Sequence, residues 1–105
     1  MSKKKIDTYI RFAIKSRNLI YGIDNIKKGI KQIKVIIADK TLSENSLDKA
    51  RLLCSRNNIP LIISEEELNN LLNTDNCKII GITNINMAEA IIQNVGEGYF
   101  LAEGK

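Results

Sequence analysis

Apolar residues gather in three short runs along this chain, at residues 35–38, 61–63 and 79–82, and these runs contain only Val, Ile, Leu, Ala and Gly. A strand with one face in water alternates apolar and polar residues, whereas these runs place apolar side chains on both faces. We therefore predict three strands that are buried on both sides of a sheet.

Longer segments around these runs repeat apolar residues every three or four positions, which is the period of an amphipathic helix. This spacing predicts helices over residues 6–14 and 47–54. The side chain of Ser43 is suited to cap the second of these helices. Asn57 to Pro60 end that helix, because a residue that precedes proline is disfavoured in the helical conformation.

Two further helices are expected in the second half of the chain. The sequence from Ser64 to Glu67 fits a capping box, in which Ser64 caps the helix and Glu67 reaches back, so that the leucines that follow face the core. We interpret the acids at 65–67 as part of this cap rather than as a metal or catalytic cluster. The last helix is expected over residues 88–95 and ends at the glycines of 96–98.

Strands that alternate with helices of about ten residues are typical of an α/β fold with helices on both faces of the sheet. A further short strand is expected at Leu19–Tyr21. We predict a three-layer αβα sandwich around a small mixed, mostly four-stranded sheet, in a single domain over residues 1–105 with its core at 6–95. Disorder is expected at residues 1–4 and in the last few residues.

The composition narrows the possible chemistry. Histidine is absent from the 105 residues, which excludes histidine bases, Ser-His-Asp and Cys-His nucleophiles and the usual zinc sites. Neither a GxGxxG nor a GxxxxGK[ST] motif is present, so we expect no cofactor, no metal and no enzymatic activity. Cys54 and Cys77 do not form a CxxC pair, and we interpret Cys54 as a small core residue.

The sequence carries no sign of membrane insertion. No apolar run approaches the ~18 residues that a membrane span needs, and no apolar signal-peptide segment follows Lys3 to Lys5. We expect a cytoplasmic protein with reduced thiols and no membrane partner.

Positive charge is concentrated in the first third of the chain. Residues 1–34 hold ten Lys and Arg side chains against Asp7 and Asp24, a net charge of +8, whereas the remaining residues carry six basic and ten acidic side chains, a net −4. We expect this segment to form one basic surface that attracts a polyanion. A solvated, lysine-rich surface without a partner is the alternative.

The segment 22–31 combines this charge with hydrogen-bonding groups. If it forms one continuous helix, isoleucines cover one face, and the opposite face carries the cations Lys27, Lys28 and Lys31. The free N–H groups at its start attract phosphates, while Asp24 and Asn25 can hydrogen-bond to base edges. In the alternative interpretation Asp24 is an ordinary N-cap and the lysines form a solvated face.

These features resemble a known family. The chain is similar to the kink-turn-binding ribosomal protein superfamily, which includes the archaeal large-subunit protein L-seven-Ae, its L-thirty-e relatives and small bacterial homologues. The resemblance extends over roughly residues 6–95 and rests on the segments 12–22, 23–30, 35–39, 54–60, 78–83 and 87–88.

The family motif Gly-x-Asn-Glu-x-x-Lys falls on Gly22, Asp24, Asn25 and Lys28, so that Gly and Lys match and the two middle positions differ. In the family these polar residues contact the sheared G·A pairs of a kinked RNA, and a loop before the last strand covers an extruded nucleotide. The resemblance places that loop at residues 73–77, which adds the candidates Thr74, Asp75 and Asn76.

The resemblance implies a non-enzymatic, ribosome-associated RNA-binding protein of bacterial type that recognises kink-turn or similarly folded RNA. Two alternatives stay open. The first is a protein-interaction module of the same fold. The second is a domain like the substrate-binding part of certain ribosomal RNA methyltransferases.

Overall fold

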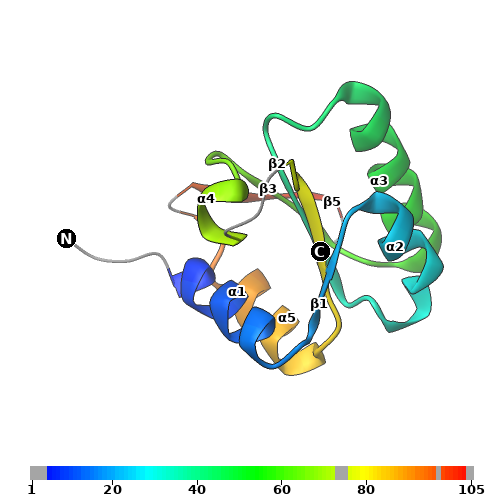
Figure 1. The fold of residues 1–105 in the computed structure, drawn as a ribbon. Coiled ribbons are helices and arrows are strands. Elements are labelled where there is room, and N and C mark those ends of the chain that lie inside the picture. Colours follow the sequence, from blue (N-terminus) through cyan, green and yellow to red (C-terminus); the bar gives the residue numbers. More distant parts are fainter. Residues whose placement is uncertain (1–4, 73–75, 97, 104–105) are drawn as a thin grey trace.

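Within the described residues, 5–72, 76–96 and 98–103 of the computed structural model, five strands form one mixed sheet with helices on both sides (Figure 1). The helices are α1 Lys5–Lys15, α2 Ile23–Lys28, the 3₁₀ helix η1 Ile30–Gln32, α3 Glu44–Asn57, α4 Asn69–Leu72 and α5 Ile85–Gln93. The strands are β1 Leu19–Tyr21, β2 Val35–Asp39, β3 Leu61–Ser64, β4 Ile79–Ile82 and β5 Tyr99–Glu103.

The strand order is β1-β4-β2-β3-β5, with β2 and β3 parallel and all other neighbours antiparallel. In this register Tyr21 faces Ile80 and Ala38 faces Ile79. The carboxyl ends of β1 and β2 therefore lie next to the amino end of β4. These three strand ends form one edge of the molecule, which we call the α2 edge because α2 begins there. The four strands expected from the sequence are confirmed.

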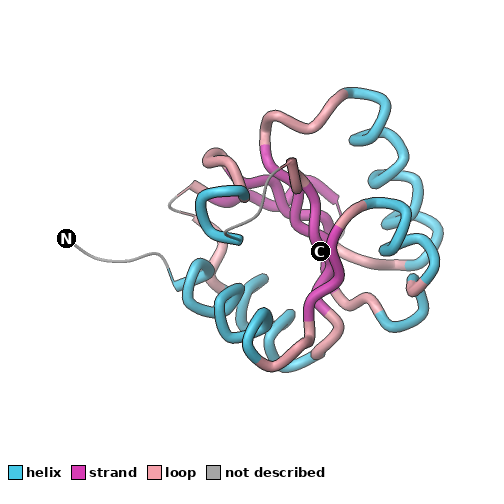
Figure 2. Tube along the Cα trace, viewed as in Figure 1, coloured by secondary structure: helices cyan, strands magenta, loops and turns pink. Residues whose placement is uncertain are grey.

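Helices cover both faces of the sheet (Figures 1 and 2). Helices α1, α4 and α5 lie on one face, where they pack on Val35, Ile37 and Ile80. Helices α2 and α3 lie on the other face and pack on Ile36 and Ala38. Neighbouring residues of β2 thus enter opposite cores, which confirms that this strand is buried on both sides.

The sheet has a fifth strand, so the prediction of a mostly four-stranded sheet is wrong. Strand β5 pairs with β3 and is an outermost strand of the sheet. It includes part of the chain end that we expected to be disordered. Tyr99 anchors it, because its ring is buried and its hydroxyl donates a hydrogen bond to the Asp7 carboxylate in α1. Burial and this carboxylate raise the pKa of Tyr99 far above its usual value. Residues 1–4 and 104–105 lie outside the described residues.

Gly81 allows α2 and the segment after it to pack directly on the backbone of β4. A Cβ atom at this position would lie 2.7 Å from Cδ1 of Ile33 and 3.3 Å from Cγ1 of Ile26. Both isoleucines are buried against the sheet. Side chains from the α2 face therefore fill the space that a larger side chain at position 81 would need.

Helix α2 is shorter than the sequence predicted. It ends at Lys28, and Gly29 separates it from η1, so residues 22–31 do not form one helix. A Cβ atom at Gly29 would lie 3.3 Å from the side chain of Ile20, which is a tight approach between the turn and β1. The helical projection that placed Lys31 beside Asp24 is therefore wrong.

The capping box at Ser64 is also wrong. The Ser64 hydroxyl donates to the Glu66 carbonyl at 2.8 Å and closes a local turn, and α4 begins only at Asn69. The buried carboxylate of Asp39 takes the capping role, because its Oδ2 accepts the backbone N–H of Leu68 at 2.9 Å. Its Oδ1 accepts the N–H of Thr41 at 2.8 Å, which keeps the buried charge hydrogen-bonded.

The remaining helix ends agree in part with the sequence. Ser43 caps α3 as predicted, since its side chain accepts the N–H of Ser46. The last helix starts three residues earlier than predicted, because the side chain of Asn84 caps it by accepting the N–H of Met87. Cys54 is buried in the α3 core, as expected.

Gly81→Ala should lower the free energy of unfolding by about 1–3 kcal/mol, because the new methyl group overpacks the contact with Ile33. Ile33→Val removes the clashing Cδ1 atom, so the double variant should be more stable than the sum of the two single effects by about 1 kcal/mol. Urea unfolding of the four proteins measures this coupling. Additive effects would show that Ile33 does not fill the space above Gly81.

Candidate nucleic-acid interface

Helix α2 begins at a backbone conformation that favours glycine. Gly22 has φ +85° and ψ 149° at the N-cap position, and no side chain caps the helix. A residue with a Cβ atom is strained there. The N-cap is therefore Gly22 and not Asp24, which lies exposed in the first turn of α2.

One hydrogen bond holds the side-chain amide of Asn25 in place. The side-chain NH₂ donates a hydrogen bond to the Tyr21 carbonyl at 3.0 Å, which ties the first turn of α2 to the end of β1. Its Oδ1 takes no part in that bond and can accept a hydrogen bond from a ligand. Asn25 is exposed, so this oxygen is accessible at the surface.

The start of α2 lies beside the segment that precedes β4. The Gly22 N–H donates to the Ile79 carbonyl at 3.0 Å, and the Asp39 N–H donates to the Lys78 carbonyl at 2.9 Å. The structure therefore brings Asn76, Cys77 and Lys78 to the same edge of the sheet as the start of α2. Asn76 is exposed with φ +62°. Thr74 and Asp75, the other two loop candidates, lie outside the described residues.

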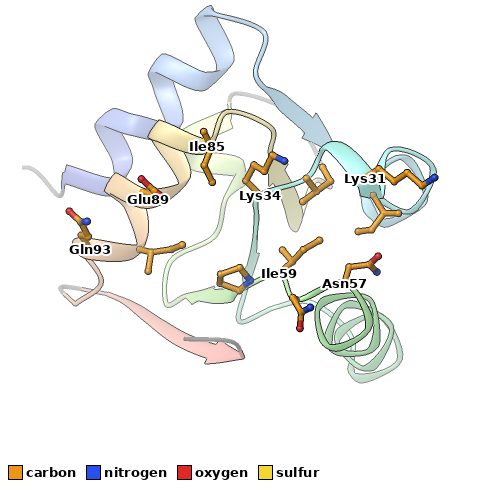
Figure 3. Close-up of a pocket in the computed structure, with 12 residues that line it drawn as sticks. Lys31, Lys34, Asn57, Ile59, Ile85, Glu89 and Gln93 are labelled. Atoms are coloured by element: carbon orange, nitrogen blue, oxygen red, sulfur yellow. The ribbon is translucent and has the colours of Figure 1, made fainter.

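Lys27 and Lys28 are exposed in the last turn of α2, one turn beyond its start. Lys31 does not join them. It follows Gly29 and lines an open cleft of about 630 Å³ at the opposite end of the sheet (Figure 3). Lys34, Ile59 and Glu89 also line that cleft, which lies between α5 and the starts of β2 and β3.

The basic N-terminal third does not form one surface, so that prediction is wrong. Helix α1 carries Lys5, Arg11 and Lys15 on one face of the sheet, whereas Lys27 and Lys28 lie with α2 on the other face (Figure 1). The chain passes from one face of the sheet to the other at β1, which lies between the two helices in the sequence. The positive charges are therefore divided between the two faces.

Three further surface residues at the same edge carry no clear signal in the sequence. Lys40 follows the end of β2 and is exposed, and Lys78 precedes β4. Tyr21, at the end of β1, is 38% exposed, and its backbone carbonyl accepts the hydrogen bond from Asn25. Each of the three lies at or next to the end of a strand, but only the pairing of β1, β2 and β4 shows that these strand ends meet.

Cys77 is half-buried just before β4. Burial raises the pKa of its thiol, and hydrogen bonds with the backbone of Ile79 and Gly22 partly oppose this effect. Burial therefore disfavours the thiolate, which is the reactive form of this cysteine. Within the described residues, no group of three Cys, Asp or Glu side chains could hold a metal ion, and no helix is long and apolar enough to cross a membrane.

Comparison with known proteins bears on the fold alone. The chain matches no protein-family model and no curated protein. It is similar to the solved structure of a protein with unknown function from Bacillus halodurans C, with a TM-score of 0.79 and 16% sequence identity. The similarity covers 85% of this chain and 94% of that chain, so the two share most of one fold.

Cys77 provides a direct probe of this edge. The pH midpoint for its alkylation should be higher in the folded protein than in the urea-unfolded chain, because burial disfavours the thiolate. Peptide mass spectrometry after iodoacetamide treatment separates Cys77 from Cys54 and gives both midpoints. Equal midpoints in the folded and unfolded protein would contradict the burial of the Cys77 sulfur.

Proposed function

We propose that this chain is a non-enzymatic, cytoplasmic RNA-binding protein that recognises kink-turn or similarly folded RNA and acts in association with the ribosome. One observation carries the proposal. Two segments far apart in the sequence, Gly22–Lys28 and Asn76–Lys78, lie together at one edge of the sheet, joined by the hydrogen bond from Gly22 to Ile79. The resemblance assigns RNA contacts to the first segment and to the loop at 73–77, which overlaps the second segment at Asn76 and Cys77, within a three-layer αβα sandwich.

The side chains at this edge supply two kinds of contact. Lys27 and Lys28 provide positive charge for phosphates, which gives affinity without sequence preference. Asp24 and the Oδ1 atom of Asn25 accept hydrogen bonds, as the N1 and N2 donors of guanine require.

The two departures from the family motif reduce affinity for a standard kink-turn. Ionised Asp24 cannot donate a hydrogen bond and repels phosphates, where relatives carry a neutral amide. Asn25 lacks the second acceptor oxygen of the glutamate found in relatives, and its NH₂ is engaged with Tyr21. We therefore expect an RNA target that differs from standard kink-turns at the G·A pairs.

The cleft of about 630 Å³ favours the alternative of a protein-interaction module. It lies at the opposite end of the sheet, and its lining includes the half-exposed Ile85 together with Ile30 and Ile92 (Figure 3). Lys31, Lys34 and Glu89 line the same cleft, and a surface that combines apolar with polar side chains is typical of a docking site for another protein. The methyltransferase-like alternative stays a prediction.

Lys28→Ala should raise the Kd for a kink-turn RNA about tenfold and reduce the slope of log Kd against log salt by about 1, because one phosphate contact is lost. The melting temperature should stay nearly constant, since the side chain is exposed. Fluorescence anisotropy at three salt concentrations and a thermal melt measure the two effects.

Lys34→Ala is the matched control, because this lysine is also exposed but lies at the opposite end of the sheet. It should leave the Kd and the salt slope unchanged. Equal losses in the two variants would mean that net charge, and not the α2 edge, determines RNA binding.

Asp24→Asn combined with Asn25→Glu should tighten binding to a kink-turn with tandem G·A pairs by about 1–3 kcal/mol, because a bidentate base contact is restored. Loss of the bond from Asn25 to Tyr21 should cost about 0.5–1.5 kcal/mol of stability, so the unfolding free energy is measured alongside. The control RNA is the same duplex without its bulge. Unchanged kink-turn affinity, or an equal gain with the control RNA, would overturn the kink-turn assignment.

A further inference from the structure

A second recessed surface lies between α2 and α3, next to the start of α2. It is a groove of about 180 Å³. Helix α3 contributes Lys49, Leu52, Leu53 and Arg56, which recur at the i, i+3, i+4 and i+7 spacing and therefore form one stripe along the helix. Leu52 is 50% exposed, although the opposite side of α3 is buried in the core through Ala50 and Cys54.

Helix α2 forms the opposite wall of this groove. Ile23 and Lys27 are one turn apart and face the α3 stripe, and Asp24 lies at the rim. The groove thus has an apolar floor, three cations around it and one carboxylate beside them. Among the described residues, none of the three cations, Lys27, Lys49 and Arg56, makes an ion pair with an acidic side chain.

The volume of the groove and the charges around it limit which ligands can bind there. The volume is below the ~300 Å³ at which pockets for whole small molecules begin, so the groove can enclose only a small flat group. Three unpaired cations around an apolar floor match a ligand with an apolar face and an anionic margin. A nucleotide has this combination, with its base as the flat group and its phosphates outside.

We infer that the groove between α2 and α3 binds one unpaired nucleotide of the RNA, with the base against Leu52 and Leu53 and the phosphates at Lys49 and Arg56. This inference rests on the proposed function and extends it, because the α3 side chains lie outside the family motif. Nucleotide binding here adds a phosphate contact through α3, and its base competes for Asp24, which belongs both to the groove and to the start of α2.

Asp24 gives the groove a preference among bases. Its carboxylate accepts hydrogen bonds and donates none when ionised, so it favours a base with an exocyclic amino group. Cytosine carries an amino group at the position where uracil carries a carbonyl oxygen, which the carboxylate repels. The groove should therefore prefer cytidine to uridine.

Mononucleotides test this site without a kink-turn. In titrations with 5′-CMP and 5′-UMP at low salt, the methyl NMR signals of Leu52 and Leu53 should shift, with 5′-UMP binding about tenfold more weakly. Asp24→Asn should bring the two affinities close together, because an amide both donates and accepts. Absence of methyl shifts, or equal affinities for the two nucleotides in the unmodified protein, would overturn the inference.

A pair of charge variants tests the same groove with RNA. Lys49→Gln combined with Arg56→Gln should weaken binding to the kink-turn RNA by about 3- to 10-fold and reduce the salt slope by about 1 to 2. The control, Lys15→Gln combined with Lys34→Gln, removes the same charge from exposed positions away from the groove. Equal weakening by the two pairs would overturn the phosphate contacts.

The two sets of measurements separate the inference from the proposed function. If the protein binds kinked and unkinked RNA equally but 5′-CMP still shifts the leucine methyls, the groove assignment holds and the kink-turn assignment fails. If Lys28→Ala reduces kink-turn binding while neither nucleotides nor the α3 variants have an effect, the proposed function holds and the groove assignment fails.

Discussion

Close packing of two isoleucines on the backbone at Gly81 determines where α2 lies. Strand β4 is buried on both faces between β1 and β2, and only the absence of a side chain at Gly81 lets Ile26 and Ile33 reach it. With α2 held on this strand, its first turn meets the segment before β4. The proposed interface is therefore a consequence of core packing, because Asn25 and its neighbours are positioned by buried residues on the opposite side of the same helix.

Much of the fold could be predicted from local pattern. The runs without polar residues gave three central strands, and Ser43 gave a helix start, because burial on two faces and side-chain capping both leave local signals. The start of α4 could not be found in this way. Its cap comes from Asp39, 29 residues away, while the nearby Ser64 closes a different turn. Strand β5 depends on pairing with β3, which is equally non-local.

The sequence located the α2 part of the candidate site, and the resemblance added Asn76 from the loop before β4. Gly22 is required by its backbone angles, and the exposure of Lys28 follows from helical spacing. Lys31 was misplaced because Gly29 interrupts the helix, a break that periodicity alone does not show. The arrival of Lys78 beside α2 depends on the antiparallel pairing of β4 with β1, which brings together residues nearly 60 positions apart. Sequence periodicity describes single elements, whereas a site is formed by their pairing.

Crosslinking of a kink-turn RNA to the protein, followed by mass spectrometry of the attached peptides, tests the central claim most directly. Ultraviolet irradiation joins bases to side chains that they touch, so the crosslinked peptides report the interface itself. We predict crosslinks within Tyr21–Lys28 and Asn76–Lys78, at the edge where β1 ends and β4 begins. Crosslinks confined to the cleft at Lys31, Lys34 and α5 would contradict the account, because they would place the RNA at the opposite end of the sheet.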